Sequence, residues 1–179
     1  MAHASSLPLR EAVPADIPAL VTLVNGAYRG ESAKVGWTHE ADLLGGTRTD
    51  AERMVALVGR HDAALLVHED GGAPVACVLV ERLQGGGAYL GMLTVKPALQ
   101  ASGVGQRLLA GAEEYVRSKW QARTVEMTVI PVRSELVAWY ERRGYVLTGE
   151  RRPFPADDTI ELLHGDVELV VLRKELSRE

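Results

Sequence analysis

The sequence predicts an α+β fold, and three features of its apolar pattern lead to that class. The expected elements follow one another as β-α-α-β-β-β-α-β-α-β-β, an order too mixed for a doubly wound parallel sheet. Two apolar runs, 63–68 and 74–82, flank the sequence Glu-Asp-Gly-Gly, which is typical of a β-hairpin. A third apolar run, 88–95, leads through a glycine-rich turn into a long helix that ends near residue 120.

The first part of the chain predicts a short strand, two helices and a long loop. The strand is expected over 7–13. The helix after it has one apolar face at helical spacing, formed by Ile17, Leu20, Val21, Val24 and Tyr28. Residues 30–49 are rich in Gly and Thr and predict a loop. Asp50 is a suitable N-cap for a second helix, whose inward-facing side chains are expected to be Met54, Leu57 and Val58.

The second half of the chain predicts further strands and one short helix. Gly91 lies inside the third apolar run and favours a bulge or a close backbone approach there. The remaining strands are expected at 124–130, 145–150 and 167–174. A helix over 135–143 ends before Gly144, which suits the C′ position of a helix.

Composition narrows the class of protein. Apolar residues make up 46% of the chain, enough for a core, and the net charge of −4 includes no block of Lys or Arg that would indicate nucleic-acid or membrane attachment. The five histidines show no metal-ligand spacing, so no metal site is expected. Cys77, the single cysteine, excludes an intramolecular disulfide and is expected to be a small buried hydrophobe. The N-terminus lacks a long apolar segment, so we expect no signal peptide or membrane span and a cytoplasmic location.

The run LGMLTVKPALQASGVGQRLLAG, residues 90–111, predicts a binding site for an anion, usually a phosphate. A helix leaves its first N–H groups unpaired, and its dipole favours negative charge at that end. Gly103 and Gly105 have no side chain to hold the backbone away from an anion. The other interpretation is an ordinary glycine-rich turn before a core helix.

Two other phosphate-binding loops do not fit this run. A Walker loop needs Lys and then Ser or Thr after its last glycine, where this chain has Gln106 and Arg107. A dinucleotide-binding fingerprint needs a third glycine where this chain has Leu108.

The sequence QASGVG, preceded by LTVKP, resembles the acetyl-CoA signature of the GNAT N-acetyltransferases. A second block, WYERRGY at 139–145, resembles the Tyr-x-x-x-Gly-Phe/Tyr ending of that family. The resemblance covers roughly 7–175 and implies a single domain with a central mixed, mostly antiparallel sheet flanked by helices. Within it, the strands on either side of the signature helix would be parallel and splayed apart where the cofactor enters.

The same resemblance implies acetyl transfer from acetyl-CoA to a primary amine by direct attack, without a metal. The Leu93 N–H would hold the thioester carbonyl, and the backbone of Leu93 and Val95 would bond the pantetheine arm. Gln100 occupies the polar first position of the motif, and Arg107 either reaches a phosphate or is an exposed helical arginine. The amides that would wrap the pyrophosphate belong to Ala101, Ser102, Gly103, Val104 and Gly105.

Acetyl transfer requires a group that takes the amine's proton and one that protonates the departing thiolate. Tyr140 resembles the family tyrosine beside the cofactor sulfur and is expected to be the acid; its other interpretation is a packing tyrosine. Some members of the family carry a Glu as the base on the signature strand, and the matching position here is Tyr89. Glu126, on the next strand, is therefore expected to replace it as the base. A solvent-facing role for Glu126, with a water chain or with Glu31 or Glu40 as base, is the alternative.

Substrate contacts are expected from Tyr28, Trp37 and Tyr89, with Thr38 and Phe154 as further candidates. The acids at 157 and 158 either attract a cationic amine or form a solvated turn. We expect a small-molecule acceptor. The alternatives are a non-catalytic acyl-CoA sensor or assembly domain and a peptide or protein acetyltransferase, and a homodimer is plausible.

Overall fold

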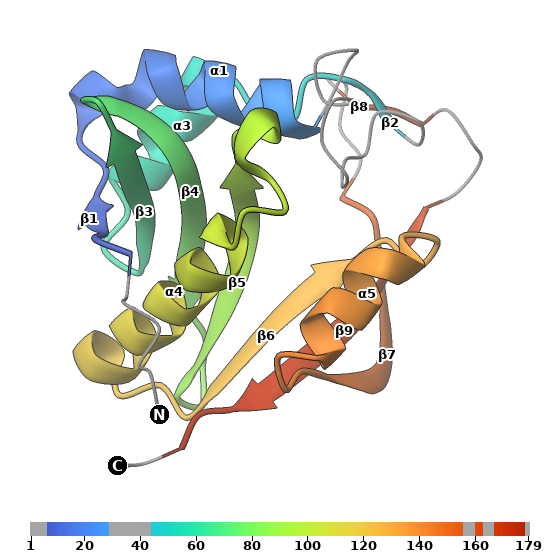
Figure 1. The fold of residues 1–179 in the computed structure, drawn as a ribbon. Coiled ribbons are helices and arrows are strands. Elements are labelled where there is room, and N and C mark those ends of the chain that lie inside the picture. The colour runs from blue at the N-terminus through green and yellow to red at the C-terminus, as the bar shows by residue number, and fades with distance from the viewer. Residues whose placement is uncertain (1–6, 29–43, 156–159, 163–166, 178–179) are drawn as a thin grey trace.

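The computed structural model describes residues 7–28, 44–155, 160–162 and 167–177, built around a seven-stranded sheet (Figure 1). Its strands, in spatial order, are β1 (Arg10–Glu11), β3 (Ala63–Asp70), β4 (Ala73–Arg82), β5 (Gly87–Val95), β6 (Thr124–Val129), β9 (Glu168–Glu175) and β7 (Val146–Pro153). All neighbouring strands in this sheet are antiparallel except β5 and β6. This arrangement confirms the predicted α+β class and the mixed, mostly antiparallel sheet.

Helices cover both faces of the sheet. Buried side chains of α1 (Ile17–Tyr28) and α3 (Ala51–Val58) pack with Leu65 and Val67 of β3. Those of α4 (Val104–Trp120) pack with the alternate residues of β3, including Leu66, and α5 (Ser134–Glu141) lies against the same cluster. Side chains alternate between the two faces of a strand, and helices cover both faces here. The side chains of β3 and β4 are therefore apolar on both faces, which explains their continuous apolar runs.

Local signals placed most helices correctly. The Asp50 side chain accepts a hydrogen bond from the Arg53 N–H at 2.9 Å, which confirms the predicted N-cap of α3. Two short 3-10 turns, η1 (Pro14–Asp16) and η2 (Pro97–Leu99), precede α1 and α4. Cys77 is fully buried in β4, and burial raises the pKa of its thiol to about 12. It is therefore a core side chain, as predicted.

The central strands β5 and β6 separate soon after they begin. They pair in parallel only where Gly87–Tyr89 faces Thr124–Glu126. Beyond that short ladder the strands diverge, so the sheet opens as a V (Figure 1). This confirms the predicted splay of the two strands. The second half of β5 therefore lies next to a gap in the sheet, and side chains from other elements line that gap.

Three parts of the fold differ from the sequence prediction. The N-terminal strand is only Arg10–Glu11, shorter than 7–13. The hairpin turn consists of Gly71 and Gly72 alone, with φ of +59° and +79°. A two-residue turn with positive φ at both positions matches the twist of the two strands that it joins. A second, two-stranded sheet joins β2 (Leu44–Gly46), inside the predicted loop 30–49, to β8 (Ile160–Leu162), between the predicted strands 145–150 and 167–174.

None of the helices in the described parts of the chain is both long and apolar enough to cross a membrane.

Candidate active site

The bulge in β5 lies where β6 has already diverged. The β4–β5 register shifts by one residue here, so Met92 and Leu93 stand opposite Val78 alone. Met92 has a φ of +51°, a strained conformation for a side chain of its size. The sequence predicted a bulge at Gly91, and it occurs on the next two residues. A bulge interrupts regular pairing, so this stretch of backbone can present groups to a ligand instead of to a neighbouring strand.

The turn between β5 and α4 has the backbone shape of an anion site. Ala101 and Gly103 have φ of +64° and +84°. Gly103 is the N-cap of α4 and supplies no side-chain hydrogen bond to the first helical amides. The Gln100 side chain donates to the Val95 carbonyl at 3.1 Å and fastens the turn to the end of β5. The amides at this helix start are therefore left for another acceptor.

A cavity of about 430 Å³ lies over this turn, between β5, the start of α4 and α5. The residues predicted to bind the cofactor that line it are Leu93, Val95, Gln100, Ala101, Gly103 and Gly105. The other three predicted residues do not line it: Val104 is buried in the core, Ser102 is exposed, and Arg107 is half-buried. The structure adds Gln106, Trp139, Arg142 and Arg143, which the sequence reasoning did not single out.

Arg143 supplies a positive group to this cavity. Its guanidinium lies over the Trp139 ring, 3.8 Å from the ring centre, and donates to the Trp139 carbonyl at 2.7 Å and to Gln106 at 3.3 Å. Burial, helped by the neighbouring charge of Arg142, lowers its pKa. The buried Nε atom has no hydrogen-bond partner among the described residues. A buried donor without a partner costs free energy, so an anion in the cavity would stabilise Arg143.

A second cavity, of about 300 Å³, lies on the other side of the bulge. Leu93 of the bulge and Leu136 of α5 line both cavities, so the two cavities adjoin at these side chains. Among the residues that line the second cavity are the tyrosines Tyr28, Tyr89 and Tyr140, the arginines Arg48, Arg53 and Arg133, and Phe154. A group held in one cavity can thus face a group held in the other across Leu93.

Tyr140 lies near this junction and is buried. Its ring makes edge contacts with Trp139, at 5.0 Å between ring centres, and with Tyr145, at 5.7 Å. Burial raises the pKa of Tyr140 well above the ordinary tyrosine value, and the nearby Arg133 and Arg143 only partly oppose this. The phenol therefore carries its proton at neutral pH, as a proton donor must, while the raised pKa makes it a weaker acid than a free tyrosine.

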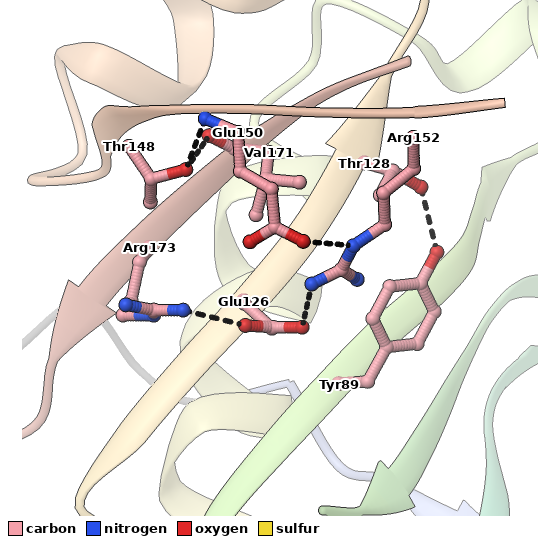
Figure 2. Close-up of polar contacts among 8 residues, drawn as sticks. All are labelled: Tyr89, Glu126, Thr128, Thr148, Glu150, Arg152, Val171 and Arg173. Atoms are coloured by element: carbon pink, nitrogen blue, oxygen red, sulfur yellow. Dashed lines mark hydrogen bonds and ion pairs between the residues drawn. The ribbon is translucent and has the colours of Figure 1, made fainter. Parts of the chain in front are cut away.

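Glu126, expected as a base, takes part in an ion-pair network. Its two carboxylate oxygens accept from Arg152 of β7 at 2.9 Å and from Arg173 of β9 at 3.0 Å (Figure 2). Arg152 also donates to Glu150 at 2.8 Å. Glu126 lines neither of the two cavities. This geometry could not be predicted from local sequence patterns, because both arginines belong to strands that follow far along the chain.

The tyrosines predicted to contact substrate occupy defined positions. The Tyr28 hydroxyl, at the end of α1, donates to the Leu93 carbonyl in the bulge. The Tyr89 hydroxyl shares a hydrogen bond with Thr128 at 2.8 Å (Figure 2). Trp37, Thr38, Glu31, Glu40 and the acids at 157 and 158 lie outside the described residues.

Comparison of the sequence with models of known protein families gives a match. The family model described as "Acetyltransferase (GNAT) family" matches residues 26–145. No curated protein matches the sequence.

Solved structures with the same fold are numerous, and three illustrate the likeness. A putative phosphinothricin N-acetyltransferase is 22% identical, covers 97% of this chain and 100% of its own, and has a TM-score of 0.71. A ribosomal-protein-alanine N-acetyltransferase from Brucella melitensis is 20% identical, with 95% and 100% coverage and a TM-score of 0.69. A putative acetyltransferase from Salmonella typhimurium, solved with acetyl-CoA, is 17% identical, with 98% and 96% coverage and a TM-score of 0.69. At these identities the likeness concerns the fold.

Proposed function

The chain belongs to the GNAT acetyltransferase family, and from that premise we propose that it acetylates the primary amine of a small molecule by direct attack on acetyl-CoA. As a member of the family it is an acetyl-CoA-dependent N-acetyltransferase. The observation that carries the proposal is the meeting of the two cavities at Leu93. One cavity suits the cofactor, and the other suits the acceptor.

The cofactor cavity fits coenzyme A by its own donors. The amides from Ala101 to Gly105 would hold the pyrophosphate, and Arg142 and Arg143 would face the phosphates from the C-cap of α5 and the turn after it. The backbone of Leu93 and Val95 would bond the pantetheine arm. When bound, acetyl-CoA supplies an acetyl group and a thiolate leaving group. The bulge at Leu93 would direct a backbone donor at the thioester oxygen as charge develops on it.

Tyr140 is the proton donor in this proposal. The acceptor amine would approach from the second cavity, and the departing thiolate would receive the Tyr140 proton. No described residue that lines either cavity carries a carboxylate. We therefore leave Glu126 out of the proton path and assign the loss of the amine proton to water in the second cavity.

The size of the second cavity favours a small acceptor. Its volume of about 300 Å³ is at the lower end of the range for small-molecule sites. Acetylation of a peptide or protein is the competing case, and the structure from Brucella melitensis carries the name of a ribosomal-protein acetyltransferase.

The decisive experiment is thiol release from acetyl-CoA with a panel of small amines beside peptides with free N-termini. We expect turnover with small amines and little with peptides. Preference for peptides would reject the small-molecule acceptor. Binding of acetyl-CoA without turnover for any acceptor would reject the proposed reaction.

Tyr140→Phe tests the proton donor. Loss of general acid catalysis is expected to lower kcat about 100-fold or more. The KM for acetyl-CoA should change little, because the ring contacts with Trp139 and Tyr145 remain. Tyr115→Phe, whose hydroxyl contacts Glu11 away from both cavities, is the matched control and should keep full activity. An equal kcat for wild type and Tyr140→Phe would contradict the role.

A further inference from the structure

The second cavity, which the proposed function assigns to the acceptor, has a positively charged wall. Arg48, Arg53 and Arg133 line it, and its described lining residues include no Asp or Glu. The three arginines come from separate places: the segment before α3, α3 itself, and the N-cap of α5. Such convergence is unusual, because like charges gathered around one cavity repel one another unless an anion separates them.

Arg48 is the most distinctive of the three. Its guanidinium carbon lies 5.5 Å from the centre of the Tyr28 ring. No carboxylate of the described residues forms an ion pair with it. By contrast, Arg60 in the neighbouring region pairs with both Asp62 and Glu81. Arg48 therefore presents a cation to the cavity with an aromatic ring as its neighbour and no described counter-ion.

The other two arginines are partly engaged and still add positive charge. Arg53 lies 3.6 Å from Asp50, but that carboxylate also accepts the N-cap hydrogen bond of α3. Arg133 lies near enough to Tyr140 for its charge to act on the phenol. The field of this wall thus extends from α3 to the place where the acetyl group would be transferred.

The position of Arg48 relative to the bulge sets the spacing of a ligand. Tyr28 faces Arg48 with its ring, and its hydroxyl donates to the Leu93 carbonyl. The one side chain of Tyr28 therefore contacts both the guanidinium and the bulge. A short acceptor can reach both at once, with its amine at Leu93 and a second group at Arg48.

A positive wall has two opposite effects on an amine. It disfavours the protonated form, which helps to produce the neutral nucleophile in a site without a described carboxylate base. It also repels an ammonium ion that approaches from water. An acceptor that carries its own negative group overcomes this repulsion and keeps the benefit.

We propose that the acceptor is an amine with an oxyanion, such as a carboxylate or a phosphonate, a few bonds away, and that Arg48 binds this oxyanion with support from Arg53 and Arg133. This inference rests on the proposed function and specifies its substrate class. Guanidinium groups bind carboxylate and phosphorus oxyanions with paired, charge-assisted hydrogen bonds, so both chemistries fit the wall.

Matched acceptor pairs test the inference. Each pair contains an amino acid and the amine that remains after its carboxylate is removed, and a parallel pair compares an aminoalkylphosphonate with the plain alkylamine. We expect kcat/KM for the anionic member to exceed that of the neutral member by about tenfold or more. The pair with the larger ratio of kcat/KM values shows whether the preferred oxyanion is a carboxylate or a phosphonate. Neutral members that react as well as anionic ones would overturn the inference and leave acetyl transfer intact.

The variant Arg48→Gln should reduce the preference for anionic over neutral acceptors towards unity, chiefly through a higher KM for the anionic members. Arg60→Gln is the matched control, because Arg60 does not line the second cavity and should leave the preference unchanged. An unchanged preference in Arg48→Gln would overturn the inference.

Calorimetry of the anionic acceptor with the CoA-loaded protein separates this inference from the proposed reaction. Binding by wild type that is lost in Arg48→Gln supports the oxyanion site even if no acceptor turns over, in which case only the proposed reaction fails. Absence of binding by every anionic member of the panel would overturn the inference.

Discussion

Individual buried tyrosines in this protein are held in their neutral form. The Tyr145 hydroxyl donates to Glu113 at 2.8 Å, and Glu113 also pairs with Lys174 at 2.7 Å. Burial raises the pKa of both Tyr140 and Tyr145, and for Tyr145 the adjacent Glu113 carboxylate adds to the effect. The same burial that keeps Tyr140 protonated therefore makes the stability of the fold depend on pH in the alkaline range.

Because their pKa values are raised in the folded chain, these tyrosines make the fold less stable as the pH rises into the alkaline range. The unfolded chain releases tyrosine protons above a pH of about 10, whereas the folded chain retains those of Tyr140 and Tyr145. Stability from these groups is thus fully present below about pH 10 and is lost as the pH rises further. Urea unfolding at a series of pH values should show this fall, and Tyr140→Phe should make it shallower. An identical alkaline slope in the variant would contradict the assignment for Tyr140.

At the scale of elements, ion pairs connect the first half of β6 to the two strands beyond it, β9 and β7. Glu126 on β6 accepts from Arg152 on β7 and Arg173 on β9 (Figure 2). The carboxylate is 9% exposed, while the arginine side chains are 35% and 44% exposed. Solvent screens the arginines, so the network is weaker than a fully buried one.

Glu126→Gln separates a structural role from a catalytic one. Loss of the negative charge leaves two arginines facing a neutral amide, and we expect about 1–2 kcal/mol lower stability in urea unfolding. The pH profile of kcat should be unchanged, because Glu126 lines neither cavity. Disappearance of the profile's acidic limb in this variant would restore Glu126 as the base.

The start of α4 offers a graded test of the cofactor site. A Cβ added at Gly105 would meet Trp139 and Val95 at 3.7 Å, which is ordinary contact. Gly105→Ala should therefore fold with equal or slightly higher stability, since alanine favours a helix over glycine by up to about 1 kcal/mol. Gly105→Glu places a carboxylate where phosphate is expected and should weaken coenzyme A binding about 100-fold or more in calorimetry. Equal affinities for wild type and Gly105→Glu would refute the assignment of this turn.

Sequence reasoning succeeded where the signal was local in the chain. The turn from Gln100 to Gly105 and the helix after it are encoded by contiguous residues, and so is the position of Tyr140 before Gly144. It failed where the partner is remote. The β2–β8 pairing joins residues more than a hundred positions apart. The positions of Arg48 and Arg143 in the cavity walls depend on how separate elements pack.

Arg143 could still have been suspected from its neighbours. It follows Arg142 directly and stands four residues after Trp139, within the block that predicted Tyr140. Helical spacing brings the arginine over the tryptophan ring, where it lies in the structure. Arg48 had no comparable signal, because its surroundings are a glycine-rich segment without periodicity.

At the scale of the whole molecule, two halves of one sheet are joined by a short seam. Strands β1, β3, β4 and β5 form one half, and β6, β9 and β7 form the other (Figure 1). The parallel seam between them covers only Gly87–Tyr89 and Thr124–Glu126. The cofactor cavity lies beyond this seam, with β5 and α4 on one side and α5 on the other. A ligand there would connect the halves where the backbone does not.

Hydrogen exchange should reveal that connection. In the unliganded protein, amides at the C-terminal end of β5 and the start of α4 lack the support of a β6 ladder, so they should exchange faster than those of β3 and β4. Saturating coenzyme A should slow exchange at Leu93, at Ala101–Gly105 and in α5, because binding stabilises the arrangement in which both halves contact the ligand. At a ligand concentration of 100 times Kd, binding stabilises this arrangement by about 2.7 kcal/mol. Gly105→Glu at the same ligand concentration should show no such protection. Protection confined to the turn, with α5 unchanged, would mean that the ligand binds one half alone and that the splayed sheet is not bridged.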